Sequence, residues 1–458
     1  MFPAHFPEYN YIWIGSFVHI AILCIIIKLF PKVYTSEFGD AVRTLHEEYR
    51  IPSRTFFPMF FMSLITVSSG CSLGPEAPIL VLGGSMATFI GEWIGLPHRT
   101  LRLFTLAGTY ASLSAFFGSP ISGIHALEFP HTVGMEFFEA LPIGIASSYV
   151  SSTIFELLYG TPYGDKFTLT TDITAVYPVH IFICKALLFH LLLFVVVALI
   201  TIPLYHHTVA LAIGVFAAIV GIIMWGFITL MRRWVRFSKM KQKIPYVQPL
   251  IAWVVFSVAG MLLPAILFWG EPDLQNVIDR NATPLPRWLG GSSGIIDLGE
   301  TYSLATVIMV GVGKIITLIV GVTHGLRGGV LFPLFAIGSS FGEAIHMITG
   351  LDQGLAVACT MSSVQGGITR APLASSLVTF FLFNQFQATM LLPILCSTYC
   401  CYIITYKFPF FDTQKERDGM VTIQFLFEND LCSFLLRFFL TVFLSKISRS
   451  TLMKSTLL

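Results

Sequence analysis

Two apolar segments, each broken by glycine and proline, recur with the same internal spacing in distant parts of the chain. The shared positions are Gly70, Gly74, Pro78, Gly83 and Ser85 in the first segment, and Gly325, Gly329, Pro333, Gly338 and Ser340 in the second. A further match follows each one, "SPISG" at 119–123 and "APLAS" at 371–375. Repeated pairs of broken apolar helices point to a substrate site at the midplane of a membrane protein. Helix packing through small residues is the simpler alternative.

The composition places this repeat in a membrane. Of the 458 residues 55% are hydrophobic and only 11% are charged, whereas a soluble domain carries about 25% charged residues. No basic run is interleaved with aromatic residues in the way that single-stranded nucleic-acid binding requires, so nucleic acid is not expected as a partner. The eight cysteines lie mostly in apolar runs without the spacing of metal ligands, and we expect buried thiols, no metal and no cofactor.

Stretches of about 20 apolar residues are expected to cross the bilayer. Eight qualify, at residues 11–30, 55–68, 141–159, 179–204, 208–231, 249–269, 303–322 and 376–405. Shorter, interrupted helices are expected at residues 77–96, 101–117, 119–129, 330–349 and 354–368. We therefore predict an all-α, multi-pass integral membrane protein. The basic run at 232–243 favours a cytoplasmic position for the end of the fifth stretch.

Glu76 lies in "SLGPEAP", directly before the apolar run of the first broken segment. Proline is favoured in the first turn of a helix, and the remaining amide hydrogens of that turn are free. A carboxylate there gains about 0.3 to 1 kcal/mol from the helix dipole. Inside a bilayer, however, an ionised carboxylate marks an ion or proton path, and free amides at a helix start bind anions. Function is therefore favoured over capping.

These residues resemble the chloride channels and chloride/proton antiporters. "GCSLGPEAP" is similar to the gate motif of that family, and "GGVLFPLFAIGSSFG" is similar to its Gly-Gly-x-x-x-Pro segment. "LPAILFWGEPDLQ" at 263–275 and "RAPLASSLV" at 370–378 also look like family segments, and the resemblance covers about residues 20–412. It implies the chloride channel fold, which consists of two inverted repeats of tilted and broken helices.

The resemblance also implies a homodimer with one pore per subunit, in which helix ends meet around chloride or a similar small anion. Glu76 would be the gating glutamate. The anion-binding positions carried over are Gly74, Pro75, Ala77, Gly329, Val330, Leu331 and Phe386, with the amides of Val330 and Leu331 facing the anion.

Three departures from the family bear on the mechanism. The serine loop expected near residues 30–40 is replaced by "PKVYTSEFGD", and Phe386 stands where a tyrosine hydroxyl is usual, so it cannot donate a hydrogen bond. A paired glutamate is replaced by "HALEFPH", in which Glu128 is either the inner proton group or a helix-end carboxylate. Channel conduction and proton-coupled exchange both stay open, as does the choice between chloride and nitrate. Arg327 either draws anions by its field or is a snorkelling or paired arginine.

We predict four parts of the chain. Residues 1–165 form the first repeat, which is expected to lack its first helix; 166–207 form a connector with an extra hydrophobic segment at 181–207; and 208–412 form the second repeat. Residues 413–458 form a short tail without the paired regulatory domains common in the family.

Three other functions were compared with transport. "GSSG" at 291–294 has the form of an intramembrane serine protease site, with Ser293 activated by His324 or His346, but Gly/Ser clusters are usually turns. "LHEEYR" has His46 and Glu47 but Arg50 where a metal site needs a second histidine. A transport-deficient scaffold of the same fold is the remaining alternative, and we do not expect an enzyme.

Overall fold

The computed structural model describes residues 11–29, 51–52, 56–119, 121–128, 137–159, 167–169, 204–237, 245–281, 301–326, 328–383, 390–411 and 414. In the first half these form α1 (Tyr11–Leu29), α3 (Phe56–Ser68), α4 (Glu76–Trp93), α5 (His98–Phe117), α6 (Ile124–Glu128) and α7 (Phe137–Tyr159). The second half contains α9 (Leu204–Phe237), η4 (Pro245–Val247), α11 (Gln248–Leu262), η5 (Pro264–Ile266), α12 (Glu271–Ile278), α13 (Leu304–Thr323), α14 (Leu331–Thr349), α15 (Gln353–Thr369), α16 (Pro372–Leu382) and α17 (Leu391–Thr405).

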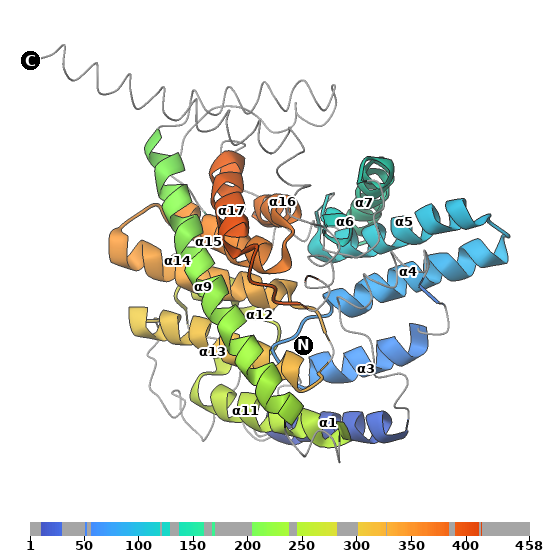
Figure 1. Cartoon of the computed structure of the whole chain (residues 1–458), viewed down its shortest axis with the longest axis horizontal. Helices are drawn as coiled ribbons and strands as arrows, with labels where there is room; N and C mark the ends of the chain where they lie inside the picture. Colours follow the sequence, from blue (N-terminus) through green and yellow to red (C-terminus); the bar gives the residue numbers. More distant parts are fainter. Residues whose placement is uncertain are drawn as a thin grey trace, which may run out of the picture.

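The helices agree with an all-α membrane protein. Within the described ranges, four segments are long and apolar enough to cross a bilayer: Ala140–Leu158, Tyr205–Val235, Leu304–Thr323 and Leu331–Thr349. Helix α9 has 34 residues, about 50 Å at 1.5 Å per residue, which exceeds the roughly 30 Å of the hydrocarbon layer. Such a helix must tilt or extend beyond the layer, and in Figure 1 it runs obliquely across the whole molecule.

The two halves are built alike. Helix α4 packs along α5 in the first half, and α14 packs along α15 in the second. Figure 1 shows the first pair on one side of the molecule and the second pair on the other. Each half turns at equivalent glycines with positive φ, since Gly70 has φ 85° after α3 and Gly325 has φ 80° after α13. Only glycine adopts this conformation without strain. Gly95 (φ 73°) and Gly350 (φ 67°) continue the same correspondence.

The turns that end α5 and α15 have the same backbone conformation but different residues. Gly118 ends α5 in the left-handed region, and Arg370 ends α15 in the same region. A side chain is disfavoured there. The guanidinium of Arg370 lies 4.7 Å from the ring centre of Tyr406 and donates to the backbone carbonyl of the same residue. These contacts hold the second copy of the turn in a conformation that the first copy reaches with glycine.

Two sequence expectations differ from the structure. Residues 376–405 were expected as one crossing segment, but they contribute to two helices, α16 and α17. The 249–269 stretch gives α11 and then the short turn η5, because Pro264 follows the end of α11 and cannot continue its hydrogen bonds. Helix α9 begins at Leu204, slightly before the predicted start of the second repeat at 208. The limits of the four parts stay predictions.

Candidate functional site

The two broken segments meet each other directly. Gly74 donates its amide to the carbonyl of Gly329 at 2.8 Å, and Gly329 donates to the carbonyl of Gly74 at 2.5 Å. This is an isolated antiparallel bridge between equivalent positions of the two repeats. Equivalent segments that run in opposite directions are expected for repeats of inverted orientation. The bridge brings the starts of α4 and α14 together.

Glu76 is the first residue of α4 and lies at this meeting point. Its side chain is fully buried. Oε1 accepts a hydrogen bond of 2.8 Å from the amide of Phe332, which is in the first turn of α14. Oε2 is buried and has no hydrogen-bond partner. The carboxylate therefore reaches from one repeat to the helix start of the other, and one of its two oxygens remains free.

The glycines of the bridge leave room for this carboxylate. A Cβ built at Gly74 would collide with both oxygens of Glu76, and one built at Gly329 would collide with Oε2. Any other residue at either position would have to displace the side chain of Glu76. The close approach of the backbone explains why the sequence carries glycine here in both repeats.

The start of α14 has no cap from its own N-cap side chain. Val330 occupies the N-cap position and provides no side-chain cap, so the first amides depend on other partners. The carboxylate of Glu76 is one such partner, and it binds Phe332, the second residue of the helix, where capping groups usually bind. Val330 and Leu331, whose amides were expected to face an anion, are buried directly before it. Ala77 is also buried, and Pro75 precedes Glu76 as the N-cap of α4.

Phe332 was not singled out from the sequence. Its ring stacks on Phe117 of α5, with 5.3 Å between centroids and 24° between planes. Phe116 meets the same ring edge-on at 5.5 Å. These contacts fix the first turn of α14 against α5, so the amide that holds Glu76 is itself held by aromatic packing across the two repeats.

A buried polar cluster anchors the segment that leads to Glu76. Ser72 donates to the carbonyl of Ile266 at 2.8 Å and pairs with the hydroxyl of Thr317 at 2.7 Å. Lys314 on α13 is 1% exposed, and its ammonium group donates to the carbonyls of Ile266, Leu267 and Phe268 at 3.1, 2.8 and 2.7 Å. All three ammonium hydrogens are therefore used, which satisfies the buried cation locally.

Glu128 ends the short helix α6 and binds a different helix start. Its Oε1 accepts from the amide of Leu373 at 2.9 Å, and its Oε2 accepts from the amide of Ala374 at 2.6 Å. Pro372, the first residue of α16, has no amide hydrogen to offer. The carboxylate thus satisfies the first two amides of α16. Of the two interpretations left open by the sequence, this geometry favours the helix-end carboxylate.

Several other predicted residues lie outside the described residues. These are Phe386, Arg327, Ser293, and the "LHEEYR" residues His46, Glu47 and Arg50, together with residues 170–203 of the connector. The two histidines proposed for a protease have local partners, since Nδ1 of His324 lies 2.9 Å from the carbonyl of Val320 and Nδ1 of His346 lies 2.6 Å from that of Leu351. Among the residues with a described position, no group of three or more metal-ligating side chains occurs.

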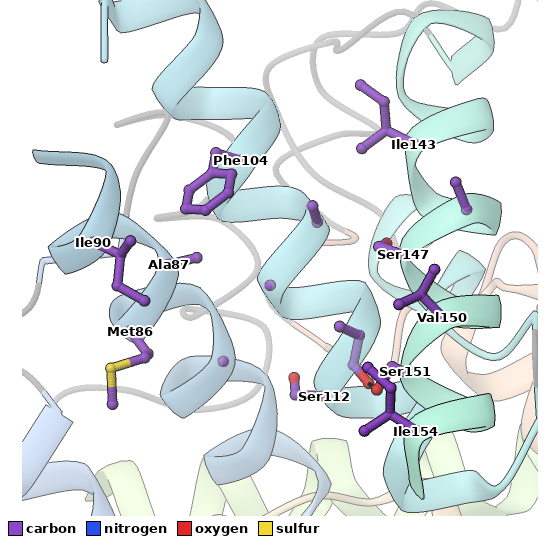
Figure 2. Close-up of a pocket in the computed structure, with 15 residues that line it drawn as sticks. Met86, Ala87, Ile90, Phe104, Ser112, Ile143, Ser147, Val150, Ser151 and Ile154 are labelled. Atoms are coloured by element: carbon purple, nitrogen blue, oxygen red, sulfur yellow. Dashed lines mark hydrogen bonds between the residues drawn. The ribbon is translucent and has the colours of Figure 1, made fainter. Parts of the chain in front are cut away.

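A groove on the outside of the molecule is separate from this site. It lies between α4, α5 and α7, has a volume of about 780 Å³, and is lined mainly by apolar side chains such as Met86, Ile90, Phe104 and Ile154. Figure 2 shows these side chains with Ser112 and Ser151 at the groove. Glu76 and Phe332 are not among its lining residues. Its mainly apolar lining suits lipid contact.

Comparison with known proteins identifies a family. The sequence model described as "Voltage gated chloride channel" matches residues 18–406. A chloride/fluoride channel protein of Pseudomonas syringae pv. tomato is 22% identical over 342 residues, which cover 74% of this chain and 65% of that protein. An H⁺/Cl⁻ exchange transporter, ClcA, of Cronobacter sakazakii is 22% identical over 410 residues, 86% of this chain and 77% of that protein.

Solved structures agree in fold. A slow cyanobacterial Cl⁻/H⁺ antiporter is similar with a TM-score of 0.66 and 14% identity, and the match covers 90% of this chain and 88% of that one. A fluoride/proton antiporter of the CLC type is similar with a TM-score of 0.58 and 21% identity, over 88% of this chain and 93% of the other. At these identities the likeness concerns the fold and not the ion.

Proposed function

Since the chain belongs to the voltage gated chloride channel family and is therefore a membrane protein, we propose that it carries chloride or a similar small anion across a membrane through a pore gated by Glu76. The observation that carries this proposal is the bond between Glu76 and the amide of Phe332. An amide at a helix start binds either an internal carboxylate or an external anion. The carboxylate and the transported anion therefore compete for the start of α14.

Proton coupling depends on protonation of the same side chain, Glu76. A protonated carboxyl group loses its charge and the charge-assisted part of its hydrogen bond to Phe332, which weakens its hold on the helix start. The free Oε2 is the oxygen that can take the proton without first breaking a hydrogen bond. We propose coupled exchange of anions and protons, because this arrangement makes anion entry and protonation of Glu76 favour each other.

The anion-binding positions proposed beside the gate are those of the two helix starts. Gly74, Pro75 and Ala77 belong to the start of α4, and Gly329, Val330 and Leu331 to the start of α14. Phe332 joins them as the residue whose amide Glu76 occupies. Backbone amides bind anions without regard to side-chain identity, which suits a site that leucine, valine and glycine surround.

Reconstituted vesicles test the proposal. The wild-type protein is expected to release a loaded anion and to move protons in the opposite direction. Glu76→Ala is expected to keep anion movement and to lose proton movement and pH dependence, since no carboxylate is left to protonate. Glu92→Ala is the matched control, because Glu92 is an exposed carboxylate near the other end of the same helix. Proton coupling that survives in Glu76→Ala would refute the gate.

The same measurement addresses the scaffold alternative. A wild-type protein that is monodisperse and reconstituted, yet passes no anion, would favour a transport-deficient member of the fold. Glu76→Ala would then also have no effect on flux.

We also propose that the protein is a homodimer. Helix α7 exposes several large apolar side chains, namely Tyr149, Val150, Ile154, Leu157 and Leu158. Such a surface contacts either lipid or a second copy of the chain. The mass of the detergent-solubilised protein, corrected for detergent, separates a monomer from a dimer.

A further inference from the structure

His125 is an ionisable side chain buried inside the first repeat, on the short helix α6. It is 0% exposed. Its ring lies against Phe117 of α5, with 6.0 Å between centroids and 21° between planes. On another side, Nε2 lies 2.8 Å from the side-chain nitrogen of Gln365 on α15. Gln365 is thus the polar side chain that contacts this buried ring.

The other polar atoms at this position have no partners. Nδ1 of His125 is buried and makes no hydrogen bond, and the same holds for Oε1 of Gln365. If Nε2 accepts from the amide group, Nδ1 carries a hydrogen without an acceptor. If the amide is turned so that Nε2 donates to Oε1, Nδ1 is an acceptor without a donor. Either tautomer leaves a ring nitrogen without a hydrogen-bond partner, and a buried unpaired polar group calls for an explanation.

An aromatic column joins His125 to the gate. The ring of His125 stacks on Phe117, and Phe117 stacks on Phe332. The amide of Phe332 holds Glu76. His125 therefore lies at the far end of a contact series that ends at the gating carboxylate.

A series of contacts links the helix of this histidine to the basic run that is predicted to be cytoplasmic. Glu128, one turn further along α6, binds the start of α16. Directly before this start, Arg370 donates to the carbonyl of Gln414. The side chain of Gln414 accepts from the amide of Phe410, and the carbonyl of Phe410 accepts from Arg232 of the basic run. Contacts thus link the end of helix α6, through the start of α16 and residues 410–414, to Arg232 near the end of α9.

Glu128 is poorly placed to carry protons itself. Both of its oxygens accept hydrogen bonds from backbone amides of α16. Protonating either oxygen would exchange an acceptor for a donor that faces an N–H group. The transferable proton would have to replace a helix cap, whereas His125 has a ring nitrogen that is already free.

We propose that His125 is the inner proton-transfer residue of this protein. The inference rests on the proposed proton-coupled exchange. In the step, a ring nitrogen takes a proton from water on the inner side, and the imidazolium releases one proton through water towards the carboxylate of Glu76. One N–H bond forms and one breaks, so the imidazole returns to its neutral form and no other reactant is consumed.

No described charged side chain competes for this position. Helix α6 packs against α5, α7 and α16, and Gln365 brings α15 to it. Arg370, a buried charged residue between α15 and α16, donates to the backbone carbonyls of Tyr406 and Gln414. The other described ionisable groups on these helices include Tyr110 on α5 and the buried thiol of Cys359 on α15, while Tyr149 and Glu156 on α7 are exposed. None of these four hydrogen-bonds to His125, and α16 has no ionisable side chain.

The number of protons moved per anion tests the proposal in vesicles that record both ions. His125→Phe keeps a flat ring against Phe117 and removes both nitrogens. We expect the proton-to-anion ratio to fall by about a hundredfold, the low end of what positioned proton-transfer groups contribute, while anion movement continues. A ratio equal to that of the wild type would overturn the proposal. A wild-type protein without anion movement would instead overturn the proposed function, so the two failures are distinguishable.

Two further variants keep the test decisive. Gln365→Met removes the hydrogen-bond partner of His125 and keeps the histidine. It is expected to lower the proton-to-anion ratio by a smaller factor than His125→Phe does. If His125→Phe does not fold, an unchanged ratio in Gln365→Met overturns the proposal. Tyr110→Phe is the matched control, because it removes another buried polar atom without a partner from an adjacent helix. A loss of coupling in Tyr110→Phe as large as that in His125→Phe would show that any buried polar deletion suffices, and would contradict a specific role.

Discussion

Glu76 and Glu128 make the same kind of contact, a hydrogen bond from a carboxylate to a helix start, in two parts of the molecule. The consequences differ. Each glutamate belongs to the first repeat, and each accepts hydrogen bonds from the start of a helix in the second repeat. Glu76 takes one amide, from Phe332, and keeps one oxygen free. Glu128 takes two amides, from Leu373 and Ala374, with both oxygens.

The difference lies in what each bond leaves available. A carboxylate held by two amides is a cap, since removing it exposes two unpaired donors. A carboxylate held by one amide in a fully buried position loses less when it leaves, and its free oxygen accepts a proton. The same pairing of a carboxylate with helix-start amides thus forms a fixed lock between two helices at Glu128 and a proposed gate at Glu76.

The largest expected effect comes from Gly74→Ala. Its new methyl group would overlap the carboxylate of Glu76, and φ at Gly74 is not in the left-handed region, so the backbone itself accepts alanine. Displacing the carboxylate removes a charge-assisted hydrogen bond worth about 1.5 to 3 kcal/mol, which corresponds to roughly tenfold to hundredfold more open gate at neutral pH. Anion release from vesicles at neutral pH measures this change.

A double-mutant cycle gives the control for Gly74→Ala. In the Glu76→Ala background the atoms that collide with the new methyl group are absent, so Gly74→Ala should change release little further. Equal effects in both backgrounds would mean that the glycine acts on the backbone and not on the gate.

A smaller effect, on stability and not on gating, is expected for Glu128→Ala. Two amides of α16 lose their acceptors, and by comparison with helix N-caps the loss is about 1 to 2 kcal/mol. Thermal unfolding of the detergent-solubilised protein measures it. The proton-to-anion ratio of the folded fraction should match the wild type. A strong loss of coupling without loss of stability would make Glu128 the proton group and would erase its difference from Glu76.

The sequence predicted the helices well because hydrophobicity and glycine/proline positions are local signals. The broken segments at 77–96 and 330–349 correspond to α4 and α14, and the glycines of the repeat do occupy equivalent turns. The prediction was wrong for 376–405, because an apolar run has the same composition whether it is one helix or two.

The contact partners of the site residues could not be predicted from the sequence. Phe332 is 256 residues from Glu76 along the chain, and no local pattern marks which amide a distant carboxylate will reach. In "HALEFPH" the sequence singled out Glu128 and not His125, because the proposed role of His125 depends on Phe117 and Gln365, which come from other helices. The two readings of Glu128 differed only in what faces its oxygens, which tertiary packing decides.

Shortening both carboxylates by one carbon gives the smallest effects and the closest comparison. In Glu76→Asp the single bond to Phe332 is out of reach, so the gate is expected to loosen in the same direction as in Gly74→Ala but with a carboxylate still present to bind protons. In Glu128→Asp one of the two amides can stay bound, so roughly half of the stability loss of Glu128→Ala is expected, about 0.5 to 1 kcal/mol. Anion release and thermal unfolding, measured on both variants, should therefore move separately: release in the first variant and stability in the second. If both variants changed release alike, the two helix starts would act as one coupled unit, and the number of amides held would not distinguish a gate from a lock.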